Sequence, residues 1–321
     1  MKKTTRTLLG IGGAFCLIGA LLFGIGFTSG GTKYVHSTNL NSMNAQEDNK
    51  ESANRFTLKK TEIPDFTSLN INLEDSDLNI EESPNEKSYI EYAQATKDKK
   101  NPVSYFIENG TLTLKEAGNT GASYYINVDI SFLQAALSSK NIEDYTKESS
   151  KYENYVTLYL PKDKLVSSAK IYLGYGDFYV KNATFDTTNI KLDDGDFDAN
   201  TLTANSGKLT FSYGDCDLQK ASLGNISLTS KDGDLTVNEL TLSGKTKIAL
   251  SYGDTEITLN DSTKKVSGFD LDTHYGTITA SGLNGNKTLD EDDDVNTFQS
   301  DSKDGKTKLS IDSKDGDITV K

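Results

Sequence analysis

Residues that build disulfide frameworks, catalytic triads and nucleic-acid surfaces are scarce in this chain of 321 residues, which has two cysteines, two histidines, no tryptophan and a net charge of −13. Cys16 and Cys216 lie far apart in different kinds of sequence, so no disulfide framework is expected. His36 lies in a polar segment and His274 in a turn, which gives no basis for a Ser-His-Asp or Cys-His set. The acidic excess excludes nucleic acid as a partner, because phosphate binding needs clustered Lys and Arg.

The one long apolar stretch is at the N-terminus, where residues 8–27 carry no charge and follow Lys2, Lys3 and Arg6. At 1.5 Å per residue the run crosses the ~30 Å hydrocarbon core of a bilayer. It is longer than the ~7–15-residue core of a signal peptide, and residues 28–31 make a poor cleavage site, so we favour an uncleaved anchor over a cleaved signal. The basic residues then place residues 1–7 in the cytoplasm as a short tail. The polar residues 28–54 are typical of a flexible linker, and the bulk of the chain lies outside the cytoplasm.

A short unit recurs through residues 166–321, in which alternating apolar residues lead into a tight glycine turn and a second short strand. The turn glycines are Gly176, Gly195, Gly214, Gly233, Gly253, Gly276 and Gly316. A period of about 19–20 residues is the signature of a solenoid, in which each unit buries its apolar face against the next. We therefore predict an all-β, β-solenoid (parallel β-helix-like) ectodomain. The long gap before Gly316, which includes the acidic residues 290–294, is interpreted as one degraded or loop-inserted coil.

Residues 55–165 are less regular and are interpreted as a membrane-proximal β region with an insertion at 129–154. Residues 71–80 match the repeat, with Ser76 in place of the glycine. The Asn109-Gly110 pair is a hairpin signal. This region is expected to cap the stack, because solenoid ends need a polar cover.

An aspartate follows nearly every turn glycine, so coils in register would form an aspartate ladder. Its members are Asp177, Asp196, Asp215, Asp234, Asp254 and Asp317. Like charges about 5 Å apart raise one another's pKa values unless the turns splay into water or cations lie between them. Calcium is the candidate cofactor, although the calcium nonapeptide and EF-hand signatures are both absent. Solvated turn acids are the other interpretation.

The residue before the turn glycine is either tyrosine or aspartate, which predicts an aromatic and acidic stripe along one edge. The tyrosines are Tyr175, Tyr213, Tyr252 and Tyr275, and the aspartates are Asp194, Asp232 and Asp315. The tyrosines could form a glycan-binding surface or simply pack between coils. The acidic residues 290–294 are either a solvated loop or a site for a cationic partner.

Two segments carry a resemblance to a known family. The start Phe66-Thr-Ser-Leu-Asn-Ile71 and the strand ending Leu158-Tyr-Leu-Pro161, followed by repeated Gly-Asp strands, resemble a bacterial putative-adhesin family of unknown function. The resemblance implies a single N-terminal span, a β-solenoid ectodomain and envelope association, with envelope stress functions in some relatives. It implies no catalytic residues.

These observations favour a membrane-anchored binding module that is adhesin-like or envelope-associated and recognises a cell-envelope or surface component, either protein or glycan. The alternative is a polysaccharide-acting enzyme on a β-helix scaffold, which would need two carboxylates at a defined separation. Here the acids recur in every copy, which favours turn geometry over a catalytic site. A regulatory sensor is a third interpretation, and it would need a membrane partner because the cytoplasmic tail is so short.

Overall fold

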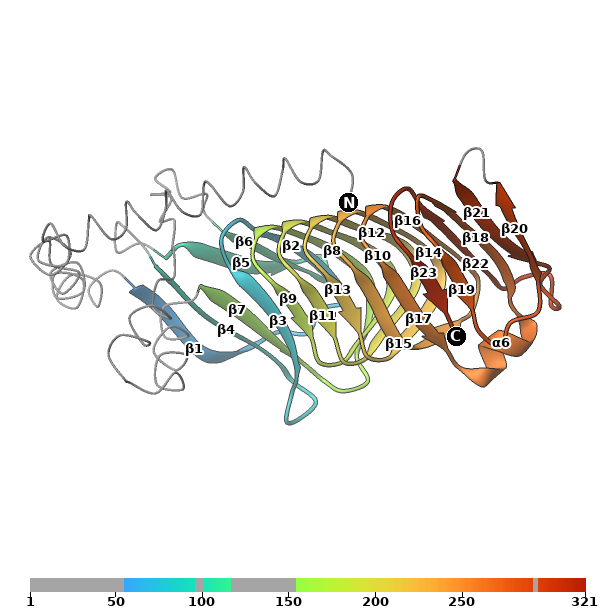
Figure 1. The fold of residues 1–321 in the computed structure, drawn as a ribbon. Coiled ribbons are helices and arrows are strands. Elements are labelled where there is room, and N and C mark those ends of the chain that lie inside the picture. Colours follow the sequence, from blue (N-terminus) through green and yellow to red (C-terminus); the bar gives the residue numbers. More distant parts are fainter. Residues whose placement is uncertain (1–54, 96–100, 117–153, 291–293) are drawn as a thin grey trace, which may run out of the picture. The chain divides into compact units, whose positions relative to one another are not determined.

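Strands make up nearly all the regular structure in this computed structural model, which describes residues 55–95, 101–116, 154–290 and 294–321 (Figure 1). Residues 56–321 form one unit. The predicted tail, transmembrane helix and linker (1–54) lie outside the described residues, as does the predicted insertion 129–154 except for Asn154. Within the described residues no helix is long and apolar enough to cross a membrane.

The fold is the predicted solenoid of parallel strands. Each coil contributes a long strand and a short strand to one continuous sheet, and we call the two sides of the solenoid that these strands form the long-strand face and the short-strand face. Ala183 pairs with Leu202, and Ser227 pairs with Lys247, so successive coils are offset by the predicted 19 or 20 residues. In stack order the long-strand face comprises β6 (Thr111–Glu116), β2 (Ser68–Leu73), β8 (Leu165–Tyr175), β10 (Ala183–Asp194), β12 (Leu202–Tyr213), β14 (Ala221–Asp232), β16 (Lys245–Tyr252), β22 (Lys308–Ser313) and β18 (Gly268–His274).

The short-strand face runs beside it in the same order. It comprises β7 (Tyr155–Leu160), β3 (Asp77–Glu82), β9 (Phe178–Val180), β11 (Phe197–Ala199), β13 (Cys216–Leu218), β15 (Leu235–Leu242), β17 (Thr255–Leu259), β23 (Ile318–Val320) and β19 (Ile278–Ala280). The short helix α6 (Asp261–Val266) follows β17, and the Asn260 side chain caps it by accepting a hydrogen bond from the Thr263 N–H.

The core consists of inward-facing columns that the two-residue alternation of each strand creates. One column of the long-strand face contains Ile171, Ile190, Leu209, Leu228, Ile248, Ile311 and Leu271, each no more than 3% exposed. On the short-strand face the rings of Phe178 and Phe197 stack with centroids 5.0 Å apart. Cys216 continues that column as a free, buried thiol, and burial raises its pKa.

The order of coils in the stack differs from their order in the chain at both ends. The β2–β3 coil lies between the β6–β7 and β8–β9 coils. The β22–β23 coil, which ends the chain, lies between the β16–β17 and β18–β19 coils. Figure 1 shows β22 and β23 inside the stack and β18, β20 and β21 beyond them.

The segment before Gly316 is not the degraded coil that the sequence predicted. Residues 286–300 form an antiparallel hairpin of β20 (Asn286–Asp290) and β21 (Val295–Ser300), and β21 pairs antiparallel with β18. The prediction was wrong because these strands are too polar to fill a coil interior, and only Phe298 of β21 is buried. The hairpin therefore covers the end of the stack.

Antiparallel strands also lie at the other end. The expectation that residues 55–165 as a whole cap the stack is met only in part, because β2, β3, β6 and β7 of this region form coils of the stack. The strand β4 (Ser88–Ala95) pairs antiparallel with β7, β5 (Val103–Glu108) pairs antiparallel with β6, and β1 (Arg55–Ile63) pairs with β4. Asn109 and Gly110 both have positive φ, at 51° and 71°, and join β5 to β6 as the predicted two-residue hairpin.

Candidate binding edge

The candidate site lies where each long strand turns into a short strand. Three columns of residues run side by side along this margin: the residue before the turn, the turn residue and the residue after it. Because the coils are in parallel register, each column joins equivalent positions of neighbouring coils.

The middle column is glycine because the coils approach too closely for a side chain. Gly195 and Gly214 have φ of 139° and 117°, and a Cβ on Gly214 would lie 2.2 Å from the carbonyl oxygen of Gly195. Ser76 begins the column, as the sequence match predicted, and its carbonyl faces Gly176. Gly276 does not have positive φ. There the left-handed residue is Tyr275, at 59°, and glycine is required because a Cβ would lie 2.0 Å from the Gly316 oxygen.

The predicted aspartate ladder is continuous, and hydrogen bonds join its steps. The Asp196 N–H donates to Asp177 Oδ1 at 2.9 Å, and the Asp215 N–H donates to Asp196 Oδ1 at 2.8 Å. The same bond, at 2.8–2.9 Å, links Asp177 to Asp77, Asp234 to Asp215, Asp254 to Asp234, Asp317 to Asp254 and Thr277 to Asp317. Asp77 and Thr277 are the two members that sequence reasoning missed. Each acceptor carboxylate thus bonds to the backbone of the next coil.

The ladder has no metal-binding cluster of the usual kind. Among the residues that the structure describes, no three His, Cys, Asp or Glu side chains are grouped so that they could hold a metal ion. The ladder's hydrogen bonds explain the recurrence of aspartate without an ion, because an acceptor after the turn binds an N–H of the next coil. Calcium between the carboxylates stays a prediction.

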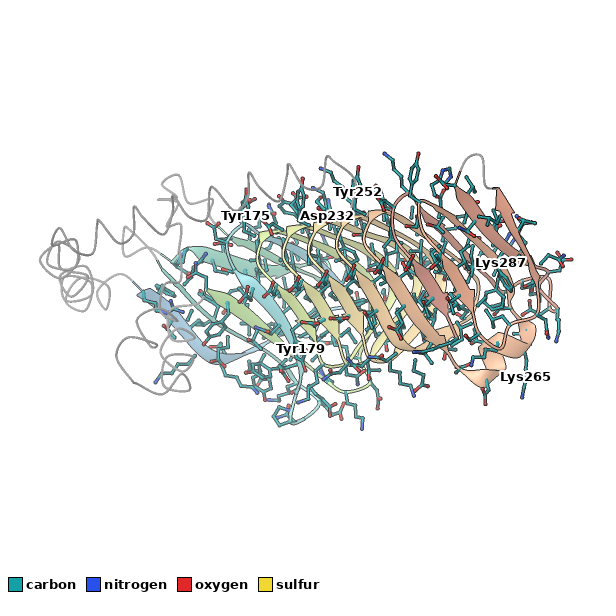
Figure 2. The ribbon with its side chains drawn as sticks, viewed as in Figure 1. Tyr175, Tyr179, Asp232, Tyr252, Lys265 and Lys287 are labelled. Carbon is teal, nitrogen blue, oxygen red and sulfur yellow. The ribbon has the colours of Figure 1, made fainter. Side chains whose placement is uncertain are left out.

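The column before the glycines alternates strictly between tyrosine and aspartate. In stack order it reads Tyr175, Asp194, Tyr213, Asp232, Tyr252, Asp315 and Tyr275, and we call these seven residues the tyrosine edge. In the sequence Tyr252 and Tyr275 appear consecutively, but the inserted β22–β23 coil brings Asp315 between them. Figure 2 shows Tyr175, Asp232 and Tyr252 along one margin of the stack and Tyr179 away from it.

The tyrosines of this edge are exposed to solvent. Tyr175, Tyr213, Tyr252 and Tyr275 are 57%, 46%, 47% and 68% exposed, so packing between coils leaves about half of each side chain free. Neighbouring strands lie about 4.8 Å apart, which places successive tyrosines about 9.5 Å apart. The alternation also separates the aspartates by the same distance, which weakens the repulsion between their charges.

Two lysines belong to the edge, and sequence reasoning missed both. Lys231 Nζ donates to Tyr213 Oη at 2.9 Å and lies 4.9 Å from the ring centroid, and this hydrogen bond raises the pKa of Lys231. Lys314 Nζ lies 5.9 Å from the centroid of Tyr252. Each lysine comes from the aspartate coil that follows the tyrosine in the stack. The signal was present in the sequence, because Ser-Lys-Asp-Gly-Asp occurs both at 230–234 and at 313–317.

Polar side chains on the long-strand face extend the edge near Tyr175. Tyr172 donates a hydrogen bond to Asp193 at 2.9 Å, and burial together with this bond raises the pKa of Tyr172 to about 12. Burial acts to raise the pKa of Asp193, but hydrogen bonds from Lys191 and Tyr172 lower it overall. Asp193 is therefore the anionic acceptor of this group.

The outer side of the short-strand face differs from the edge. Tyr179 accepts a hydrogen bond from Asn200 at 2.8 Å. Asp198 of β11 and Asp217 of β13 lie opposite each other in the register of these parallel strands. Burial and the charge of Asp217 raise the pKa of Asp198. This face has no tyrosine–aspartate alternation.

Fold and edge together define the class of protein, a parallel β-solenoid whose turn residues stack into polar and aromatic columns. The family model described as Toastrack DUF4097 matches residues 66–321, and the chain belongs to that family. The putative-adhesin resemblance and the solenoid that it implied agree with this assignment.

Several solved structures are similar to this chain. They include a putative cell adhesion protein from Clostridium sporogenes (14% identity, 82% of this chain and 99% of that one, TM-score 0.36) and a putative adhesin from Parabacteroides merdae (13%, 84% and 98%, TM-score 0.42). A putative lipid binding protein from Parabacteroides distasonis is also similar (12%, 84% and 98%, TM-score 0.36). A comparison with curated proteins found no match. Similarity at this level assigns no ligand to the chain.

Proposed function

We propose that the protein is a membrane-anchored, extracytoplasmic binding module that is adhesin-like and holds a cell-envelope or surface component along the tyrosine edge. The observation that carries the proposal is the line of half-exposed tyrosines at a fixed spacing. Aromatic side chains contribute a large contact area at low entropic cost, so a row of them in water is unusual unless it contacts a partner. The uncharged residues 8–27 support the anchor.

Co-sedimentation of the full-length protein, in detergent micelles, with insoluble bacterial envelope material tests this function. We expect the wild-type protein to sediment with the envelope and the Tyr213→Ser/Tyr252→Ser variant to stay in the supernatant. Tyr179→Ser is the matched control, because it removes the same side chain from another face. Equal retention of all three proteins would exclude the edge as the binding surface.

The same experiment separates binding from catalysis. Sugars released into the supernatant would favour the polysaccharide-acting enzyme, whereas retention without release supports a binding module. The anchor has its own test, which is the N-terminal residue of the mature chain and its cell fraction. A chain that starts near residues 28–32 and is found in the medium would contradict the anchor. Loss of envelope binding without any change in stress signalling would argue against a sensor.

A further inference from the structure

We infer that the tyrosine edge binds a linear, β-linked polysaccharide with uncharged sugar rings, in which each disaccharide matches two coils. This inference rests on the proposed function and names the ligand of the same edge. Four features of the edge carry it: the spacing, the polar groups between the rings, the charge and the positions of the lysines.

The spacing matches the repeat of such a polymer. Successive tyrosines are two strands apart, or about 9.5 Å. In an extended β-1,4-linked chain each sugar ring is turned over relative to the one before it, so the same ring face returns once per disaccharide, at close to this distance. Tyr213 and Tyr252 would therefore meet equivalent faces of the polymer. The C–H groups of a sugar face pack on the electron-rich face of an aromatic ring.

The polar side chains between the tyrosines can form hydrogen bonds with the hydroxyl groups of a sugar. Asp194, Asp232 and Asp315 are exposed carboxylates, each with acceptor sites for two or more O–H donors. The Lys231 ammonium supplies donors beside Tyr213. A sugar ring carries both donors and acceptors around its rim, so it satisfies both kinds of group at each step.

Two peptide ligands fit less well. Side chains on one side of an extended strand recur every ~6.7 Å, which does not match the tyrosine spacing. A polyproline helix repeats every ~9.3 Å and does match it. However, proline has no N–H, so a proline-rich ligand would present only acceptors to Asp194, Asp232 and Asp315 and leave these carboxylates without donors.

Charge narrows the class of polysaccharide. The chain carries a net charge of −13, and the edge has three aspartates, so a uronic-acid or phosphate-bearing polymer would be repelled. A cationic partner is disfavoured locally, because the ammonium groups of Lys231 and Lys314 lie 4.9 and 5.9 Å from the ring centroids of Tyr213 and Tyr252 and would repel a further positive charge there. A polymer of uncharged sugar rings avoids repulsion both by the aspartates and by the lysines.

The test is equilibrium binding of the full-length protein to β-1,4-linked oligomers of glucose and of N-acetylglucosamine with two, four, six and eight rings. Affinity is expected to rise with each added disaccharide, because each one reaches a further tyrosine. α-1,4-Linked glucose oligomers of equal length are the linkage control, because they coil and cannot follow a straight row. The Tyr213→Ser/Tyr252→Ser variant should lose about tenfold in affinity per tyrosine removed, whereas Tyr179→Ser should bind as the wild type.

A variant that removes two negative charges from the edge distinguishes a neutral sugar ligand from a cationic ligand. In Asp232→Asn/Asp315→Asn the amide oxygens still accept hydrogen bonds, so sugar binding should change by only a few-fold, whereas a cationic ligand such as oligolysine would lose most of its affinity. Equal binding of α- and β-linked oligomers, no gain with length, or preferential binding of oligolysine or a polyproline peptide would overturn the inference. Envelope binding that depends on Tyr213 and Tyr252 without binding of either oligomer would refute the ligand but not the function. If the protein bound neither the envelope material nor the oligomers, the proposed ligand and the proposed function would both be refuted.

Discussion

The middle of the solenoid and its two ends are built from the same coil but assembled differently. From β10 to β17 each coil lies against the coil that precedes it in the chain. At the ends the β2–β3 and β22–β23 coils each lie between two coils that are consecutive in the chain but distant from the inserted coil in sequence. The comparison teaches that the repeat specifies the shape of a coil but not its neighbour, because every coil offers the same columns above and below.

The ends also differ from the middle in which side chain accepts hydrogen bonds from the backbone N–H groups of the turns. In the middle, an aspartate of the ladder accepts the N–H of the next coil. At the β6 end a buried glutamate does this, because Glu116 Oε2 accepts from the N–H groups of Glu74 and Asp75 at 2.8 and 3.0 Å. At the other end the hairpin of β20 and β21 covers the last coil.

The largest expected effect comes from removing the inserted coil. Deleting residues 306–321 takes away Leu309, Ile311, Ile318 and Val320, each at most 1% exposed. At about 1.5–3 kcal/mol for each buried side chain, the loss is of order 6 kcal/mol or more. We expect amide hydrogen exchange in β18 and β19 to become fast, although both strands remain in the chain.

The control for the deletion is Phe298→Ala, which changes only the terminal hairpin and should leave the middle coils protected from exchange. Unchanged protection of β18 in the deletion variant would mean that the inserted coil is dispensable. The inserted coil would then contribute no more to the stability of its neighbours than a coil at the end of the stack.

A methyl group in the glycine column should have the next largest effect. Gly214→Ala combines positive φ with a contact of 2.2 Å to a backbone oxygen, and we expect a loss of about 3 kcal/mol or more in the free energy of unfolding. Gly282→Ala is the matched control, since Gly282 has φ of 71° with nothing near its Cβ position, and should cost about 1 kcal/mol. Denaturant unfolding measures both. Equal losses would show that the coils can move apart to accommodate a side chain.

Removing one hydrogen bond of the aspartate ladder should have a smaller effect on stability. Asp215→Ala removes the acceptor of the Asp234 N–H, and we expect a loss of about 1 kcal/mol because the turn is exposed. Asp317→Ala makes the same cut in the inserted coil, where the lost partner is the Thr277 N–H. Thermal unfolding of the two variants compares a middle step with an end step. A loss several times larger for Asp317→Ala would show that the ladder stabilises the end more than the middle.

Calcium in the ladder has a separate test, which uses the wild-type protein. An ion held between carboxylates would make the Tm lower in chelator than in millimolar calcium, because a ligand that binds only the folded state stabilises it. The same Tm in both conditions would remove calcium from the ladder.

The smallest expected effect belongs to the glutamate at the β6 end. Burial raises the pKa of Glu116 above its usual value of 4.5, against the effect of its two backbone hydrogen bonds. A carboxyl with a raised folded-state pKa contributes stability below its unfolded pKa and loses it as the pH rises through the folded pKa. Glu116→Gln should therefore raise the Tm slightly at pH 7, and the gain should fall towards zero in acid. A lower Tm at pH 7 would mean that the negative charge itself stabilises the cap.

Much of the middle could be predicted from the sequence, because its signals are local. The spacing of Gly176, Gly195 and Gly214 gave the coil length, and the alternation around Ile171 and Ile190 gave the inward face. The aspartates after the glycines were correctly aligned in one column. These predictions needed only a turn that requires glycine and a strand period of two.

The ends could not be predicted in the same way. Ile311 and Ile318 fit any gap in the stack as well as the one they fill, so the apolar pattern does not reveal that β22–β23 is inserted. The contacts of Lys231 and Lys314 depend on which coil comes next, so they were missed as well. The strict tyrosine–aspartate alternation was hidden for the same reason, since it exists only in stack order.

The place of the last coil bears on the biosynthesis of the protein. The chain is made from its N-terminus, so β18 and β19 are synthesised before the coil that must lie beneath them. The part of the stack that contains β18 and β19 cannot be completed step by step as the chain emerges, and it can close only after β22 and β23 have been made. A chain ended early by a premature stop codon would lack an internal layer and would leave two apolar surfaces uncovered. The complete stack therefore forms only from a chain that includes both β22 and β23.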